Sequence, residues 1–198
     1  MEPIILASAS PRRQEILKKL NLPFTVYPSN FDEKIPSDME LEKVPEYFAS
    51  QKVGAVAKIV SIEKESCWIL GADTMVIFHN KAFGKPKSLE EARETLQTLQ
   101  GKTHKVITAI ALFNGNIQEL STRTSVNKVT FKEMTKEEIN WYLNTYEWHD
   151  AAGAYKIQGL SSRFIKKIEG TESSIIGLPI FELYDILTEQ NYFGNENF

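Results

Sequence analysis

Two arginines stand at the start of a segment that the sequence predicts to be a helix. Arg12 and Arg13 follow Pro11, which is favoured at the first helical position, and Ser10, a common N-cap residue. Because the amino end of a helix carries partial positive charge, cations there cost roughly 0.3–1 kcal/mol each. A bound anion removes this conflict, since backbone N–H groups, the Ser8 hydroxyl and both guanidinium groups would meet one phosphate chain. The alternative is that both arginines point into solvent and pair with acidic neighbours.

An aspartate inside an apolar strand is the second candidate. Asp73 lies within residues 68–78, a run of mostly apolar side chains. Burial of an unpaired carboxylate costs several kcal/mol, so Asp73 needs a partner or a cavity. A metal ion or an attacking water would supply one. The alternative is an aspartate at a strand end that caps a nearby turn.

Two lysines supply a third hint of a charged site. Lys52 is four residues from both Phe48 and Val56, which places it on the buried stripe of a predicted helix. Lys85 lies in a Gly-Lys-Pro turn that follows the strand of Asp73. The alternative for both lysines is that the ammonium group extends to water.

Two further polar residues are weaker candidates when taken alone. Glu33 lies in a polar loop, and Gln158 stands beside Gly159, where its amide could read a donor and an acceptor on a base edge. Each would otherwise be interpreted as solvated. The histidines show no ligand spacing with cysteine or with each other, which argues against a structural zinc site; they are His79, His104 and His149.

The elements that must position these residues alternate between strands and helices. Strands are predicted at residues 4–6, 24–27, 68–78, 105–113 and 117–131, the last two joined by an Asn-Gly-Asn hairpin. Helices are predicted after Ser10, at residues 45–60, 88–99 and 135–144, and after Pro179. This order indicates an α/β fold with a mixed sheet.

Composition bounds the class of protein and its partners. The chain has 198 residues, of which 42% are hydrophobic and 25% charged, and this mixture favours one globular domain. Its net charge of -3 gives no global attraction for nucleic acid or membranes, so a local basic cluster must hold any phosphate. The single cysteine, Cys67, is interpreted as a small buried hydrophobe and favours a reducing compartment. The sequence shows no secretory signal and no apolar run long enough to span a membrane, so we expect a cytoplasmic protein.

A series of short motifs runs in order along almost the whole chain. Residues 6–13 read LASASPRR, and the motifs that follow are Asp32-Glu33, Lys52, Gly71-Ala72-Asp73-Thr74, Gly84-Lys85-Pro86, Gly101-Lys102-Thr103-His104-Lys105-Val106 with Thr108, Gly153-Ala154-Tyr155, Ile157-Gln158-Gly159 and Gly177-Leu178-Pro179. Together they resemble the Maf family of nucleoside triphosphate pyrophosphatases. The resemblance implies an elongated α/β fold with a mixed sheet, flanking helices and a deep cleft between two lobes, similar to the inosine triphosphate pyrophosphatases. It also implies a single Maf-like domain over residues 1–198.

The resemblance further implies an activity and a role for each candidate residue. The activity is hydrolysis of a nucleoside triphosphate to the monophosphate and pyrophosphate with Mg²⁺ or Mn²⁺. Hard oxygen ligands and the lack of a Cys/His cluster favour these ions over zinc. The implied roles are triphosphate binding by Ser8, Arg12, Arg13 and Thr74; charge neutralisation by Lys52 and Lys85; metal or water binding by Glu33 and Asp73, with Asp73 as general base; and base contact by Gln158.

The implied substrate follows from one motif, although neighbouring positions depart from the family pattern. The Ile-Gln-Gly motif that contains Gln158 resembles the branch that hydrolyses dTTP and UTP, whereas the branch acting on methylated guanosine triphosphate tends to have glutamate. Modified pyrimidine triphosphates are further candidate substrates. Ala151 replaces a common lysine, Lys156 replaces a glycine, and an asparagine common before Gly177 is absent. These departures affect base preference and cleft shape more than the phosphate motif.

Two other functions stay open from the sequence. One is a non-catalytic nucleotide-binding regulator of cell division, although a pure binder of polyanions has no use for the Asp73 carboxylate unless a metal is present. The other is a hydrolase of nucleoside diphosphates or sugar nucleotides, which yields different products. A homodimer is compatible with the sequence, in which Trp141, Tyr142 and Trp148 could serve an interface or the core.

Overall fold

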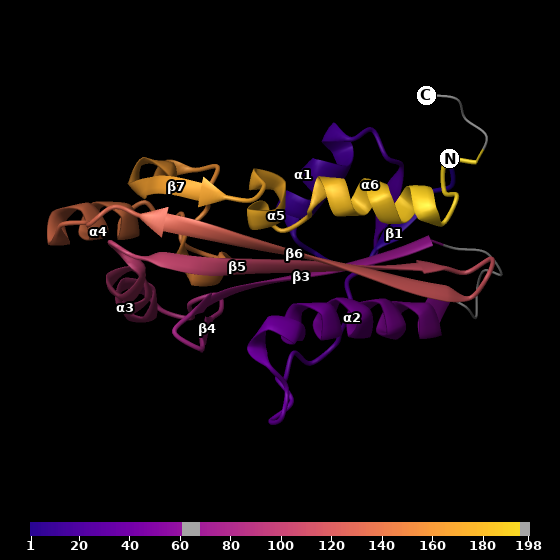
Figure 1. Ribbon diagram of the computed structural model, residues 1–198, viewed down its shortest axis with the longest axis horizontal. Helices are drawn as coiled ribbons and strands as arrows, with labels where there is room; N and C mark the ends of the chain where they lie inside the picture. The colour runs from indigo at the N-terminus through magenta and orange to yellow at the C-terminus, as the bar shows by residue number, and fades with distance from the viewer. Residues whose placement is uncertain (61–67, 195–198) are drawn as a thin grey trace. The chain divides into compact units, whose positions relative to one another are not determined.

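The computed structural model describes residues 1–60 and 68–194, so Cys67 and its predicted burial lie outside the described residues. Seven strands form one mixed sheet in the order β2-β1-β3-β5-β6-β7, with β4 paired to β3 (Figure 1). The strands are β1 (Ile4–Leu6), β2 (Phe24–Val26), β3 (Trp68–Phe78), β4 (Lys81–Phe83), β5 (Thr103–Asn114), β6 (Glu119–Phe131) and β7 (Ile165–Glu169). β1 runs parallel to β2 and β3, whereas β4 and β7 are antiparallel to their partners. The predicted mixed sheet is therefore confirmed.

In the part of the chain that the structure describes, six α-helices and short 3₁₀ turns accompany the sheet. The helices are α1 (Pro11–Lys19), α2 (Val44–Val60), α3 (Leu89–Leu99), α4 (Lys136–Leu143), α5 (Glu172–Ile176) and α6 (Ile180–Glu189), and the turns are Leu41–Lys43, Ala152–Ala154 and Leu160–Phe164. Within the described part of the chain, no helix has the length and apolar character needed to cross a membrane.

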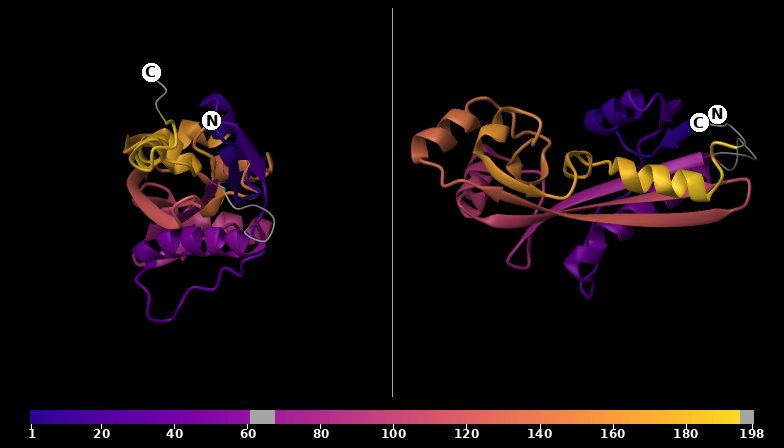
Figure 2. Two further views of the ribbon diagram at one scale, coloured as in Figure 1. Left: turned by 90° about the vertical axis from the view of Figure 1, so that its right-hand side faces the viewer. Right: turned by 45° about the horizontal axis from the view of Figure 1, so that its top comes forward.

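The chain divides into two compact units, neither of which is one continuous stretch. The first comprises Met1–Asp73, Thr108–Ser125 and Gly177–Phe198, and the second comprises Thr74–Ile107 and Val126–Ile176. In the first unit, α2 lies on one side of the strands, and α1 and α6 lie on the other (Figures 1 and 2). One core cluster of this unit joins the inner face of α2 to β1, β3 and β5; its members include Ile5, Ala49, Val53, Val56, Ile69 and Ala109.

The second unit has its own aromatic-rich core. Tyr142 and Trp148, whose place in core or interface the sequence left open, are 0% and 2% exposed within this core. Trp141 is partly exposed, and the Arg163 guanidinium lies 4.0 Å from the centroid of its ring. Two of the three aromatic residues considered for an interface therefore serve the core.

The turn that precedes α1 shows how the sequence sets up the first candidate residues. Pro11 opens the helix as predicted, because its fixed φ suits the first helical position. Ser10 stands at the N-cap but makes no side-chain capping hydrogen bond there. Its backbone N–H instead donates to the Ser8 hydroxyl at 3.3 Å. The Ser8 side chain is therefore held inside the turn that leads to Arg12 and Arg13.

Candidate active site

Arg13 is a buried cation in the first turn of α1. It is 9% exposed, and its Nη1 donates a hydrogen bond to the Ser8 hydroxyl at 2.8 Å. Its Nε donates to the main-chain carbonyl of Gly177, also at 2.8 Å. Burial lowers the pKa of Arg13, while the Asp73 carboxylate opposes this shift, so the two charges interact. Arg12 is half-buried. The solvated alternative for Arg13 is therefore wrong.

Lys52 lies between two carboxylates in the first unit. Its Nζ is 2.6 Å from Oδ1 of Asp73 and 2.6 Å from Oε1 of Glu33. The side chains of Lys52 and Asp73 are 8% and 9% exposed, whereas that of Glu33 is 53% exposed. Lys52 does not extend to water, and Asp73 has the buried partner that its apolar surroundings required. A helix, a strand and a loop thus meet at one ammonium group.

Gly71 explains how α2 comes close enough for this contact. A Cβ at Gly71 would lie 2.3 Å from the Ala49 carbonyl oxygen and 2.8 Å from a methyl group of Val53. Only glycine therefore allows the backbone of β3 to approach α2 here. Side chains two apart on a strand share a face, so Gly71 makes room for the helix and Asp73 points toward it. Lys52, three residues after Ala49, reaches the carboxylate.

An aromatic cluster anchors the loop that carries Glu33. The ring of Phe31 packs edge-on against Phe48, with centroids 5.7 Å apart, and against Tyr47 at 6.4 Å. Both partners belong to α2, the helix that also carries Lys52. Edge-to-face ring pairs of this kind stabilise by about 0.5–1.5 kcal/mol beyond their burial. The loop is therefore held to the same helix at two points, Phe31 and Glu33.

Burial dominates the electrostatics of Asp73. It raises the pKa of the carboxyl group, while Lys52 and Arg13 lower it and Glu33 raises it further. A carboxyl group with a raised pKa that still keeps two cations nearby can accept a proton more readily than a solvated aspartate. Perturbed groups of this kind cluster at functional sites, and the role of Asp73 as general base stays a prediction.

The remaining predicted residues lie in the second unit. Thr74 opens it on β3, and Lys85 and Gln158 are exposed. The Gly153 N–H donates to the Gly84 carbonyl at 3.1 Å, so the turn of Lys85 lies beside the loop that precedes Gln158. The structure thus brings together Ser8, Arg13, Glu33, Lys52 and Asp73 in one unit, and the neighbourhoods of Lys85 and Gln158 in the other.

Three residues with roles at the site were not singled out from the sequence. Gly71 gave a signal, because a glycine inside an apolar strand suggests close approach of another backbone. Phe31 gave only its aromatic character inside a polar loop. Gly177 belongs to a family motif, but nothing local indicates that its carbonyl accepts a bond from Arg13, 164 residues away.

Comparison with protein families identifies the chain as a Maf-like protein. The profile of the family described as Maf-like protein matches residues 3–190, so the chain belongs to that family. A protein of Desulforamulus reducens named dTTP/UTP pyrophosphatase is 43% identical over 187 residues, covering 94% of this chain and 96% of its own. A protein of Treponema denticola with the same name is 44% identical over 200 residues, covering 97% and 98%.

Comparison with solved structures supports the fold. The structure of the Staphylococcus aureus Ham1 protein aligns with a TM-score of 0.50 at 14% identity and covers 99% of this chain and 100% of its own. At this identity the likeness shows the fold alone. It confirms the predicted mixed α/β fold with flanking helices.

Proposed function

We propose that the chain hydrolyses nucleoside triphosphates, dTTP and UTP in particular, to the monophosphate and pyrophosphate. The observation that carries the proposal is the buried Asp73 carboxylate, which interacts with both Lys52 and Arg13 in the first unit. This arrangement combines an anion-binding arginine with a proton acceptor, as attack of water on a phosphate requires. The names of relatives more than 40% identical over nearly full length support the same reaction and base.

The proposed reaction gives each candidate residue one role. Arg12, Arg13 and the Ser8 hydroxyl bind the triphosphate, with Thr74 contributing from β3. Asp73 takes a proton from a water molecule whose oxygen attacks the α-phosphorus, and the bond to the β-phosphate oxygen breaks, so pyrophosphate leaves. Lys52 and Lys85 offset the negative charge that gathers on the phosphoryl oxygens. Gln158 contacts the pyrimidine base.

The donor set at the site fits a hard divalent cation. Glu33 and Asp73 present carboxylate oxygens, the ligands that Mg²⁺ and Mn²⁺ prefer. Residues 1–60 and 68–194 hold no group of three or more His, Cys, Asp or Glu side chains placed to bind a metal. Mg²⁺ commonly uses one or two carboxylates together with substrate phosphates, so these two residues would suffice once a triphosphate is bound. The bound ion would polarise phosphoryl oxygens and lower the pKa of water.

A product assay tests the proposal. Purified protein with Mg²⁺ or Mn²⁺ is incubated with a panel of nucleotides, and pyrophosphate and orthophosphate are measured separately. We expect pyrophosphate from dTTP and UTP, with loss of at least about 100-fold in Asp73→Asn, because positioned acid–base groups contribute 10²–10⁴-fold. The exposed Asp38→Asn is the control and should keep full activity.

The alternatives predict different products. Release of orthophosphate, or activity on diphosphates, would identify another class of phosphate hydrolase. No product from any nucleotide, with tight nucleotide binding, would support the non-catalytic regulator instead. We also propose that residues 1–198 act as a single domain, since both compact units are assembled from interleaved segments of the chain. The single cysteine favours a reducing compartment, so we propose that the protein acts in the cytoplasm.

A further inference from the structure

The orientation of Arg13 depends on a main-chain oxygen far away in the sequence. The guanidinium group is planar, and its N–H donors have fixed directions. Two of these donors are used at 2.8 Å, Nε by the carbonyl of Gly177 and Nη1 by the Ser8 hydroxyl. Because these two hydrogen bonds join one planar group to two separate segments of the chain, they fix the orientation of the guanidinium plane.

Gly177 has a backbone conformation that other residues rarely adopt. Its φ is 124°, in the region that favours glycine. It directly follows the end of α5 at Ile176, and two residues later Pro179 forms the N-cap of α6. A side chain at this position would push φ toward common values and rotate the adjoining peptide. The carbonyl would then turn away from Arg13.

The segment that carries this carbonyl is tied to the core of the first unit. Leu178 is 0% exposed, and α6 buries Leu183, Ile186 and Leu187. These contacts hold the start of α6, and with it the Gly177 peptide, against the sheet. The carbonyl is thus supported by packed elements rather than by a solvent-exposed loop.

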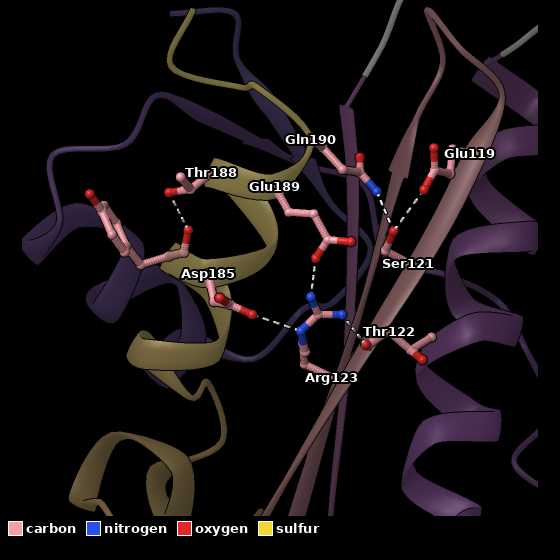
Figure 3. A network of polar contacts seen from close by, with 9 residues as sticks. Glu119, Ser121, Thr122, Arg123, Asp185, Thr188, Glu189 and Gln190 are labelled. Carbon is pink, nitrogen blue, oxygen red and sulfur yellow. Dashed lines mark hydrogen bonds and ion pairs between the residues drawn. The ribbon is translucent and has the colours of Figure 1, made fainter. Parts of the chain in front are cut away.

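Ionic contacts between α6 and β6 add to this attachment. Figure 3 shows the guanidinium of Arg123 on β6 between Asp185 and Glu189, one helical turn apart on α6. Arg123 Nε lies 2.8 Å from Asp185 Oδ2, and its Nη1 donates to the Thr122 carbonyl at 2.9 Å. All of these groups are partly exposed, so they support the helix weakly compared with its apolar face.

We propose that Gly177 is a positioning residue for Arg13 and thereby for the triphosphate. A carbonyl oxygen is neutral, so it orients the guanidinium group and leaves its positive charge to act on phosphate oxygens. Arg13 is then preorganised before substrate arrives, which reduces the cost of binding. This inference rests on the proposed function, in which Arg13 binds the triphosphate.

A double-mutant cycle tests the inference. The variants are Gly177→Ala, Arg13→Lys and their combination, and the readouts are the affinity for pyrophosphate by calorimetry and kcat and KM for dTTP. Lysine cannot bond both oxygens in the fixed geometry of arginine. We expect Gly177→Ala to lower kcat/KM by on the order of 10- to 100-fold, because small misplacements cost that much. We expect Gly177→Ala to cause little further loss when it is combined with Arg13→Lys, because both substitutions act through the Arg13 guanidinium group.

Independent losses that multiply in the double variant would overturn the inference, as would unchanged pyrophosphate affinity in Gly177→Ala. Gly101→Ala is the control for backbone strain: its φ is 67°, and the atoms nearest to a Cβ there belong to Glu133, with Cγ at 3.0 Å and Cα at 3.8 Å. This control should keep the wild-type affinity for pyrophosphate. If the alanine variant does not fold, the contact is tested on the unaltered protein instead.

A measurement on the unaltered protein separates this inference from the proposed function. In the NMR spectrum, the Arg13 Nε–H should exchange slowly with solvent and show a through-bond correlation to the Gly177 carbonyl carbon. A rapidly exchanging Nε–H without that correlation would overturn the positioning role. If the wild-type protein released no pyrophosphate from any nucleotide, the proposed function would fail, while this spectrum would still decide the contact.

Discussion

Lys52 and Asp73 form a buried ion pair, with Nζ 2.6 Å from Oδ1 and both side chains less than a tenth exposed. The pair joins α2 to β3 at a point where the surrounding residues are apolar. A buried pair is no stronger than a well-packed apolar contact, but loss of one partner leaves an uncompensated charge. Such a pair therefore indicates a functional requirement for the charges rather than a gain in stability.

Removal of the Lys52 charge should destabilise the fold, because it leaves a buried carboxylate uncompensated. Lys52→Met is expected to lower the free energy of unfolding by about 3 kcal/mol, because it leaves Asp73 buried without its cation. Lys34→Met is the matched control, since Lys34 also lies 2.6 Å from its partner Asp32, but with 86% and 71% of the two side chains exposed. It should cost about 1 kcal/mol or less. Urea unfolding at neutral pH measures both, and equal losses would contradict the account.

Gly71→Ala should separate α2 from β3. The added Cβ meets the Ala49 carbonyl at 2.3 Å, so the helix must shift and Lys52 must move from Asp73. We expect a loss of about 1–3 kcal/mol in stability and on the order of 100-fold in kcat/KM. Gly54→Ala on α2, where a Cβ meets nothing within 4 Å, should keep activity. Normal turnover by Gly71→Ala would show that the close approach is unnecessary.

His104 should make the protein less stable in acid. Burial lowers its pKa from 6.5 to about 4, and its Nε2 lies 2.8 Å from the Tyr155 hydroxyl. Between pH 6.5 and about pH 4, the unfolded chain binds more protons at this histidine than the folded chain does. The free energy of unfolding therefore falls by about 3 kcal/mol as pH drops from 6.5 to 4, and this contribution is constant above pH 6.5.

Unfolding by denaturant at several pH values measures this effect. His104→Gln, which keeps a polar group for Tyr155, should remove most of this slope. The exposed His149→Gln should leave it unchanged. A slope that survives in His104→Gln would assign the acid sensitivity to other groups.

Arg123→Ala should affect stability slightly and the reaction hardly at all. Its ion pairs with Asp185 and Glu189 are partly exposed, so we expect a loss of about 1 kcal/mol or less that shrinks in high salt. The apolar face of α6 keeps the helix in place. Thermal unfolding at low and high salt, with kcat/KM for dTTP, checks this. A large loss of kcat/KM would mean that Arg123 governs the position of the Gly177 carbonyl.

The fold could be predicted from the sequence wherever apolar patterning was strong. The strand at residues 68–78 and the start of α1 at Pro11 agree with the structure, because continuous apolar runs and N-terminal prolines have few alternatives. The Ser10 side chain does not cap its helix, since capping also depends on the rotamer and on Ser8 in the same turn. β4 and β7 were missed, because Lys-Ala-Phe lacks the β-branched residues that marked β1 and β2, and two charged lysines interrupt the apolar pattern of β7.

The candidate site was predictable in its residue types but not in its contacts. The mismatch of Asp73 with its apolar neighbours and of Arg13 with the helix dipole marked both positions. Patterning could not show that Lys52 contacts Glu33 and Asp73 at once, because that contact depends on the tertiary approach of a loop, a helix and a strand. The bond from Arg13 to Gly177 joins residues 164 positions apart, which no local pattern encodes.

Hydrolysis of dTTP in ¹⁸O-labelled water tests the central claim most directly. In the proposed reaction water attacks the α-phosphorus, so mass spectrometry should find the label in thymidine monophosphate and none in pyrophosphate. The rate of labelling should fall at least about 100-fold in Asp73→Asn and stay normal in Asp38→Asn. Label in pyrophosphate or orthophosphate, or undiminished labelling by Asp73→Asn, would contradict the account.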